Sequence, residues 1–138
     1  MRETFVLDSS VTLAWCYHDE ATVSTDELRD SLVSECDILV PRLYLEVANA
    51  LHVGERRKRI APAETQQFLD FLERLPIGVD GQTERLTWNN SLELARQHKL
   101  SVYDAAYLEL ARRKGIALAT LDRPLRDAAA KSDVNLRN

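Results

Sequence analysis

Four short apolar runs, separated by longer stretches of helical periodicity, constrain the fold of this chain more than any other feature. The runs lie at residues 5–7, 38–40, 77–79 and 116–119. Their shortness and continuity are typical of buried strands, and the spacing of apolar residues between them, as at 43–51, predicts amphipathic helices. Because alternating strands and helices favour right-handed crossovers, we expect a three-layer α/β/α domain with a mostly parallel sheet. A weak strand signal, Val-Asn-Leu at 134–136, makes this sheet four- to five-stranded.

Cap signals mark the ends of several predicted helices. Ser24 with Glu27, and Ser101 with Asp104, have the spacing of capping boxes. Gly115 suits a helix C-terminus, where a left-handed residue commonly ends the last turn. These signals place the predicted helices after the strands, as a crossover arrangement requires.

Length and composition predict one globular domain over residues 1–138. A chain of 138 residues that is 45% hydrophobic can bury one sizeable core. Its apolar runs fall well short of the ~20 residues that cross a bilayer, and its N-terminus does not resemble a signal peptide. Cys16 and Cys36 lack metal-ligand spacing and suit buried thiols in a reducing compartment. We therefore expect a cytoplasmic protein with no membrane partner.

Four acidic residues are expected to meet at one edge of the sheet. Asp8 and Asp122 follow predicted strands, whereas Glu46 and Asp104 fall in the first turns of predicted helices. In an open parallel sheet, loops and helix starts converge in the crevice beyond the carboxyl ends of the strands. Each acid alone has a simpler explanation, because carboxylates at helix N-termini cap backbone amides. Together they would repel one another unless a cation neutralised them.

This set of oxygen ligands predicts metal-dependent chemistry. Hard oxygen ligands favour Mg²⁺ or Mn²⁺, and such ions activate water and stabilise the charge that develops on a phosphodiester. The four glycines form no phosphate-binding loop, and no Ser-His-Asp or Cys-His arrangement is recognisable. The net charge of -4 disfavours nucleic-acid binding by bulk electrostatics. A metal-dependent nuclease, a phosphodiesterase with catalytic carboxylates, follows as the hypothesis.

Two further groups of residues bear on substrate binding. Arg123 lies beside Asp122, which makes it a candidate phosphate contact. Aromatic side chains can stack on unpaired RNA bases, although core packing is the favoured interpretation for most of them. The aromatic residues considered are Trp15, Tyr17, Trp88, Tyr103 and Tyr107.

Four short motifs occur in order along the chain: FVLDSS at 5–10, the stretch at 41–51 that ends in EVANAL, LSVYDAAYL at 100–108, and LATLD at 118–122. In this order and context they resemble the motifs of PIN-domain ribonucleases, specifically VapC toxins of toxin–antitoxin pairs. The resemblance covers the chain from about Phe5 to its end. It implies an endoribonuclease that cuts RNA with Mg²⁺ or Mn²⁺, and it implies that the acidic quartet consists of Asp8, Glu46, Asp104 and Asp122.

The resemblance also implies supporting residues and partners. Ser10 and Thr120 match hydroxyl residues that would support the acids, and Asn49 matches a frequent polar position, although a plain helix-face hydrogen bond explains it equally well. A small antitoxin that blocks the site and a homodimer are implied as well. Apolar residues on the early helices are candidates for such contacts: Leu28, Leu32, Tyr44 and Val53.

Three alternatives remain at this stage. A phosphoacceptor receiver domain also has an acidic Mg²⁺ pocket, but it would carry adjacent acids after the first strand and a lysine after the last, whereas Ser9 follows Asp8. A non-catalytic binding protein would use the acids only as helix caps. A PIN-fold DNA nuclease is the third, because oxygen-ligated metals do not read the sugar. The small size of the chain favours RNA over DNA.

Overall fold

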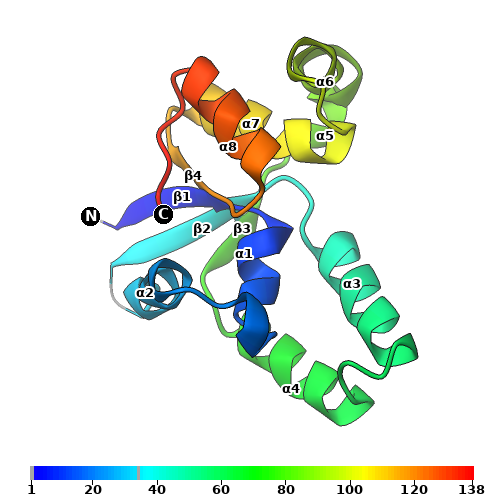
Figure 1. The fold of residues 1–138 in the computed structure, drawn as a ribbon. Coiled ribbons are helices and arrows are strands. Elements are labelled where there is room, and N and C mark those ends of the chain that lie inside the picture. Colours follow the sequence, from blue (N-terminus) through cyan, green and yellow to red (C-terminus); the bar gives the residue numbers. More distant parts are fainter. Residues whose placement is uncertain (1, 34) are drawn as a thin grey trace.

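The computed structural model describes residues 2–33 and 35–138 and consists of a parallel sheet between two layers of helices (Figure 1). The sheet has the order β3-β2-β1-β4, and all three neighbouring pairs are parallel. Its strands are β1 (Glu3–Leu7), β2 (Cys36–Val40), β3 (Ile77–Val79) and β4 (Ala117–Ala119). The predicted fold class and the four predicted strands are therefore confirmed, with β1 and β2 each two residues longer at the start.

Each face of the sheet is covered by one set of helices. One layer holds α1 (Ser9–Ala14), α2 (Val23–Ser31), α3 (Tyr44–Arg56) and α4 (Pro62–Glu73). The other layer holds α5 (Thr83–Leu86), a π-helical turn (Thr87–Ser91), α6 (Leu92–His98), α7 (Val102–Lys114) and α8 (Arg123–Lys131). A short 3-10 helix (His18–Glu20) joins α1 to α2. Within residues 2–33 and 35–138, no helix is both long and apolar enough to span a membrane.

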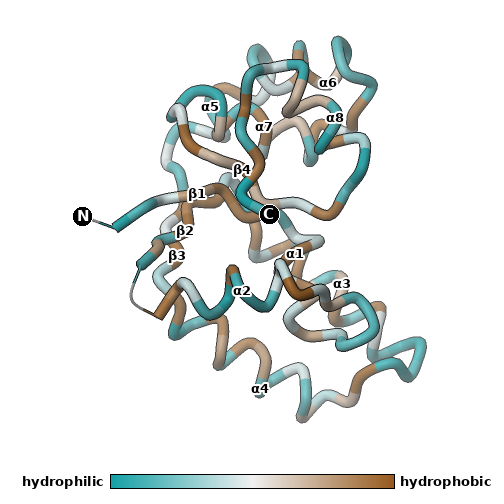
Figure 2. Tube along the Cα trace, turned by 60° about the vertical axis from the view of Figure 1, so that its left-hand side comes forward, coloured by the Kyte–Doolittle hydropathy of each residue, from teal (hydrophilic) through white to brown (hydrophobic). Residues whose placement is uncertain are grey.

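Alternation of side chains along the strands creates two cores, because successive residues of a strand point to opposite faces. Phe5 and Leu7 are buried against α1–α4, whereas Val6 between them is buried against α6–α8. Figure 2 shows the strands as a hydrophobic band between the helices. Leu28 and Leu32, each 3% exposed, belong to the first core. The prediction that these two leucines contact a partner was therefore wrong.

Three local predictions are corrected or confirmed by the helix ends. The capping box of α2 is formed by Thr22 and Thr25, with Thr22 Oγ1 accepting from the Thr25 amide at 3.1 Å, so the box predicted two residues later was wrong. Ser101 caps α7 as predicted, accepting from the Asp104 amide at 3.1 Å. Gly115 ends the same helix at a φ of 66°, where a residue without a Cβ is favoured.

The predicted fifth strand is reduced to one bridge. Leu136 pairs with Leu118 in parallel orientation, supported by a hydrogen bond from the Leu118 amide to the Asn135 carbonyl at 2.9 Å. The chain reaches this position through a turn in which Asp133 has a φ of 58°. After that turn too few residues run beside β4 to build a ladder.

Candidate active site

The order of the strands reverses beside β1. The chain moves outward from β1 to β2 and β3, and then returns to place β4 on the other side of β1. The loops after β1 and β4 therefore leave the sheet side by side, and α1 and α8 lie on opposite faces (Figure 1). Such a reversal of strand order is where ligands bind in open α/β sheets. Asp8 and Asp122 lie in these two loops.

Asp8 lies at the carboxyl end of β1 and is 3% exposed. Its carboxylate accepts hydrogen bonds from Ser10 Oγ at 2.6 Å and the Val11 amide at 3.1 Å, and also from Thr120 Oγ1. Burial raises the pKa of Asp8 to about 6, although these hydrogen bonds oppose the shift. Asp8 is thus the N-cap of α1 and a buried acid that is costly to ionise.

Ser10 and Thr120 connect the loops that follow β1 and β4. Besides donating to Asp8, Ser10 Oγ accepts from the Leu121 amide at 2.9 Å. Thr120 Oγ1 likewise accepts from the Asp122 amide at 3.0 Å. These hydrogen bonds fix the separation between the two loops and thereby orient the acids that they carry.

Asp122 is the N-cap of α8. Its Oδ2 accepts from the Leu125 amide at 3.0 Å, and its Oδ1 makes no hydrogen bond within the described residues. Capping therefore explains one oxygen of Asp122 and leaves the other free for a ligand. Asp104, by contrast, lies in the first turn of α7 while Ser101 caps that helix, so capping does not explain Asp104.

Glu46 extends the acidic group toward α3 and α7. Burial raises its pKa, Ser9 and Tyr107 counter this by hydrogen bonding, and the charge of Asp104 raises it further. The Tyr107 hydroxyl is buried beside this carboxylate, and the described residues offer it no hydrogen bond of ordinary length and angle. A buried donor with unsatisfied capacity next to several carboxylates marks a polar site that is incomplete within the chain.

Asp104 is the electrostatic link among the four predicted acids. Burial raises its pKa, and the charge of Asp122 raises it further. Its own charge raises the pKa of both Asp8 and Glu46. Within residues 2–33 and 35–138, none of the four acids forms an ion pair with a Lys, Arg or His side chain. The structure thus brings the predicted quartet into one electrostatic neighbourhood, where Arg42 acts on Glu46 without forming an ion pair with it.

The donor set fits a divalent cation. All four groups are carboxylates, the hard ligands that Mg²⁺ and Mn²⁺ prefer, and their mutual repulsion favours binding of a positive charge. In the described part of the chain, no three Asp, Glu, His or Cys side chains converge closely enough to hold an ion as they stand. The four carboxylates influence one another electrostatically but are not gathered into a ligand cluster in the described residues.

The remaining predicted site residues lie at the rim. Arg123 is the exposed first residue of α8, directly after Asp122. Asn49 is exposed on α3, one turn beyond Glu46, and lines the same surface hollow as Glu46 and Tyr103. Of the aromatic residues, Trp15, Tyr17 and Tyr107 are buried as favoured, whereas Trp88 and Tyr103 are exposed.

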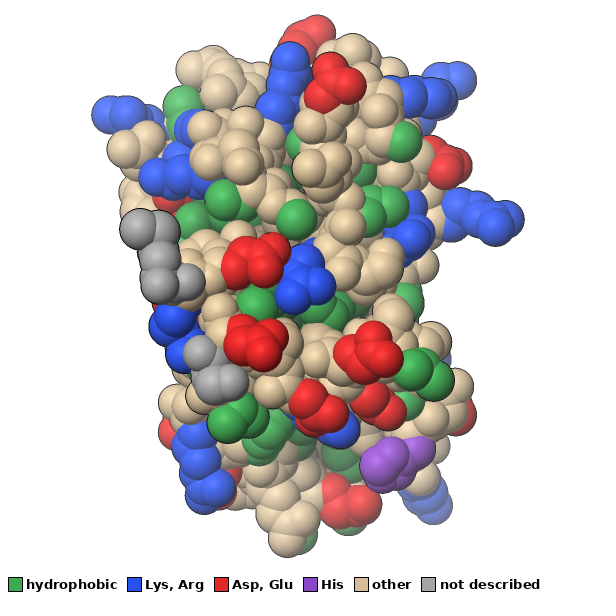
Figure 3. Space-filling model, turned by 90° about the vertical axis from the view of Figure 1, so that its left-hand side faces the viewer, with side chains coloured by type: hydrophobic (Ala, Val, Ile, Leu, Met, Phe, Trp, Pro, Cys, Tyr) green, Lys and Arg blue, Asp and Glu red, His purple; other side chains and the backbone are tan. Residues whose placement is uncertain are grey.

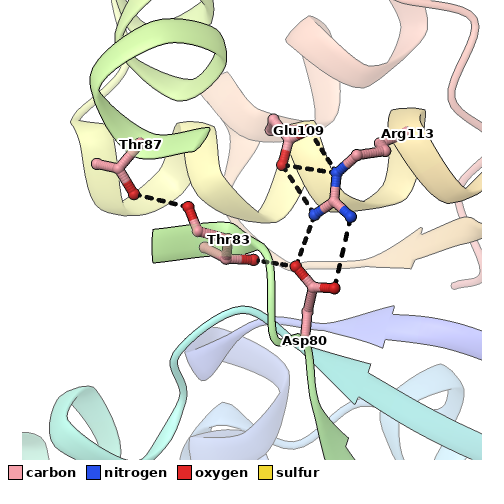
Figure 4. Close-up of polar contacts among 5 residues, drawn as sticks. All are labelled: Asp80, Thr83, Thr87, Glu109 and Arg113. Atoms are coloured by element: carbon pink, nitrogen blue, oxygen red, sulfur yellow. Dashed lines mark hydrogen bonds and ion pairs between the residues drawn. The ribbon is translucent and has the colours of Figure 1, made fainter. Parts of the chain in front are cut away.

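Sequence reasoning missed a fifth acid at this edge. Asp80 directly follows β3, as Asp8 follows β1, and the rule that singled out Asp8 applies to it equally. Figure 4 shows its carboxylate held by Arg113 of α7, with an Nη2–Oδ2 distance of 2.6 Å. Arg113 also binds Glu109, through Nε and Oε2 at 2.9 Å. Asp80 and Glu109 thus both form ion pairs with a cation inside the chain.

The opposite edge of the sheet has a different charge arrangement. The strands begin at this edge, which faces the viewer in Figure 3. Acidic and basic side chains lie together on this face. Near the strand starts Arg2 pairs with Asp37 at 2.7 Å, and Arg137 pairs with Glu3 at 3.3 Å. Asp37 and Glu3 therefore have counter-ions at this edge, unlike the four acids at the carboxyl edge.

Comparisons with known proteins identify relatives of this chain. Ribonuclease VapC3 of Pyrobaculum aerophilum is 32% identical over 120 residues, which are 87% of this chain and 90% of that protein. The crystal structure of PAE2754 from the same organism has a TM-score of 0.64 at 24% identity and covers 91% of this chain and 79% of that one.

Two complexes share the same fold. VapBC2 from Rickettsia felis, bound to a DNA fragment from their promoter, gives a TM-score of 0.63 at 17% identity and 96% coverage of both chains. FitAcB from Neisseria gonorrhoeae gives 0.56 at 17% identity, with 97% and 96% covered. The family model described as the PIN domain matches residues 5–131. The chain therefore belongs to the PIN-domain family, in which Ribonuclease VapC3 is one of its relatives.

Proposed function

We propose that this protein is an endoribonuclease that hydrolyses RNA phosphodiester bonds with Mg²⁺ or Mn²⁺ and serves as the toxin of a toxin–antitoxin pair. The observation that carries the proposal is the group of Asp8, Glu46, Asp104 and Asp122, in which Asp104 repels the other three and no acid forms an ion pair within the described residues. The relative named as a ribonuclease supports RNA as the substrate.

Each acid has a distinct task in this proposal. Asp8, Asp104 and Asp122 would hold the ion, with Glu46 beside them on α3. A bound ion would supply activation of water and stabilisation of the charge on the phosphate that is attacked. Ser10 and Thr120 keep Asp8 ionisable by donating hydrogen bonds to it, and Arg123 is placed to contact a substrate phosphate. Asn49 would contact substrate or solvent beside Glu46.

The same proposal includes a partner and an assembly. Neighbours named VapBC2 and FitAcB support a small antitoxin that covers the crevice. We further propose a homodimer that acts in the cytoplasm. Co-expression with its antitoxin should relieve growth arrest caused by the protein alone; arrest that persists although a complex has formed would contradict binding at the crevice. A PIN-fold DNA nuclease is the alternative to this proposal. The match of the PIN-domain family model to residues 5–131 counts against a receiver domain.

The decisive test replaces one acid at a time by its amide. Asp8→Asn, Glu46→Gln, Asp104→Asn and Asp122→Asn should each reduce Mg²⁺-dependent cleavage by at least about 100-fold, because the amide keeps the shape but removes the charge. Purified variants are compared on a pool of structured RNAs with Mg²⁺, Mn²⁺ or EDTA, and circular dichroism checks their fold.

Matched controls separate charge at the site from charge in general. Asp127→Asn removes an exposed acid from the same helix that Asp122 caps, and it should leave cleavage unchanged. A DNA pool of the same sequences tests the alternative substrate. RNA cleavage that survives all four amide substitutions, or that survives EDTA, would show that the proposed mechanism is wrong.

A further inference from the structure

Two surface hollows adjoin the acidic site along α3 and α7. The first, which we call the β3 hollow, has a volume of about 440 Å³. The second, the Asn49 hollow, has a volume of about 410 Å³. Arg42, Glu46 and Tyr103 line both. Because Glu46 is one of the four site acids, both hollows open directly beside the proposed reaction centre.

The walls of the β3 hollow suit a nucleotide. Tyr103 is 66% exposed although it is aromatic, and Val79, which also lines the hollow, is 51% exposed. An exposed aromatic face beside apolar side chains offers a platform on which a base can stack. The volume lies within the ~300–1,000 Å³ that bound small molecules occupy.

The charge of the β3 hollow also favours a phosphate at one position. Arg42 is exposed, forms no ion pair within the described residues and is the one cation that they contribute to either lining. Three acids, Glu46, Asp80 and Glu84, lie in the same wall, and Asp80 is paired with Arg113. Guanidinium groups pair well with phosphate oxygens, so Arg42 is the position in this wall that suits a phosphate.

We propose that Arg42 and Tyr103 form a subsite for one unpaired nucleotide next to the phosphate that is cleaved, with its base on the Tyr103 ring and its phosphate on Arg42. This inference rests on the proposed nuclease function and extends it. A base held on an aromatic face must be unstacked from its neighbours, so the subsite selects single-stranded segments over duplexes. Both residues position substrate and take no part in proton transfer or metal binding.

Binding of a short RNA tests the subsite without cleavage. A six-nucleotide unpaired RNA with a fluorophore is titrated by anisotropy in Mg²⁺ into Asp8→Asn protein, which would not cut it. Adding Tyr103→Ala should weaken binding about tenfold. Adding Arg42→Gln should weaken it about fivefold and lower the salt dependence by about one phosphate contact. Tyr103→Phe and Arg42→Lys should retain most of the affinity.

Two controls match these changes elsewhere on the surface. Trp88→Ala removes another exposed aromatic side chain, and Arg57→Gln removes an exposed arginine at the far end of α3; neither residue lines the two hollows. If these controls weaken binding as much as the subsite variants, or if the RNA does not bind, the subsite is wrong. Equal affinity for a duplex would also overturn it.

Cleavage in the wild-type background distinguishes this proposal from the nuclease proposal. Tyr103→Ala and Arg42→Gln should raise KM and leave kcat within about twofold, because they act on binding. If both variants cleave RNA with an unchanged KM, the subsite proposal is wrong and the nuclease proposal stands. If RNA binding depends on both residues but the wild-type protein cleaves no RNA, the nuclease proposal is wrong and the subsite stands. Variants that lose only inhibition by an antitoxin would show that the hollow takes a protein segment instead.

Discussion

Two groups of carboxylates lie at the carboxyl edge of the same sheet and solve the problem of their charge in different ways. Asp80 and Glu109 surround Arg113, and the side chains of these three residues are 5%, 3% and 19% exposed. Asp8, Glu46, Asp104 and Asp122 have no such cation within the described residues. In the first group each carboxylate is paired with a cation of the chain, and in the second none is.

The difference is visible in the pKa values. Burial opposes ionisation of Asp80, but hydrogen bonds from Arg113 and Thr83 outweigh it and lower the pKa. At Asp8, hydrogen bonds from neutral donors do not compensate for burial, and its pKa rises to about 6. Neutral hydroxyls and amides therefore do not replace a cation. An acid that stays in such surroundings is suited to a positive ligand from outside the chain.

The largest effect is expected from removing Arg113, the cation that pairs with Asp80 and Glu109. Arg113→Met should lower the free energy of unfolding by about 3 kcal/mol, because it leaves two buried carboxylates without a counter-charge. Urea unfolding measures the change, and the neighbouring exposed Arg112→Met serves as the control. If both variants are equally stable, the Arg113 network contributes nothing to folding. Adding Asp80→Asn and Glu109→Gln to Arg113→Met should recover part of the loss.

Binding of a metal ion to the other group, the four predicted acids, should have the next largest effect. Mn²⁺ at about 100 times its Kd should stabilise the wild-type protein by about 2.7 kcal/mol, because an ion that binds only the native state shifts the equilibrium by mass action. Thermal unfolding with and without Mn²⁺ measures it. Asp104→Asn should lose most of the increment, whereas Asp80→Asn should keep it. Equal increments in both variants would place the ion elsewhere.

A smaller effect of opposite sign is expected without metal. In EDTA, Asp104→Asn should leave the unfolding free energy unchanged or raise it by up to about 1 kcal/mol, since it removes a charge that repels Asp122, Asp8 and Glu46. Asp80→Asn should instead destabilise, because Arg113 loses one of its two acids. A clear loss of stability in metal-free Asp104→Asn would contradict the charge repulsion inferred here.

The last expected effect is a difference in slope with pH, measured by urea unfolding in EDTA between pH 3 and 7. The folded pKa of Asp80 is lowered, so its contribution is present above the unfolded value and is lost as pH falls through the folded pKa. The folded pKa of Asp8 is raised from 3.8 to about 6, so its unfavourable contribution is relieved as pH falls through that window. Asp80→Asn and Asp8→Asn should therefore change the slope in opposite directions, and changes of the same sign would refute the comparison.

Local sequence patterns were sufficient to predict the strands, the layers and the positions of the four acids. Strand and helix periodicities depend on nearby residues, and a residue that directly follows a parallel strand must lie at its carboxyl edge. Asp8 and Asp122 were found in this way. Asp80 met the same condition, so its position at this edge was predictable from the sequence as well. The position of Asp80 alone does not reveal its role, because that role depends on its ion pair with Arg113, which is distant in the sequence.

Only the tertiary structure decided which acids are neutralised and which aromatic faces are exposed. Arg113 reaches Asp80 across 33 positions of sequence, and Thr120 reaches Asp8 across 112. Tyr103 and Tyr107 lie one turn apart on α7, yet one is exposed beside Arg42 and the other is buried beside Glu46. Sequence periodicity determines which residues share a face of a helix or strand. What that face meets depends on packing between distant segments, and the electrostatic energy of a carboxylate depends on whether a cation is brought within hydrogen-bonding distance.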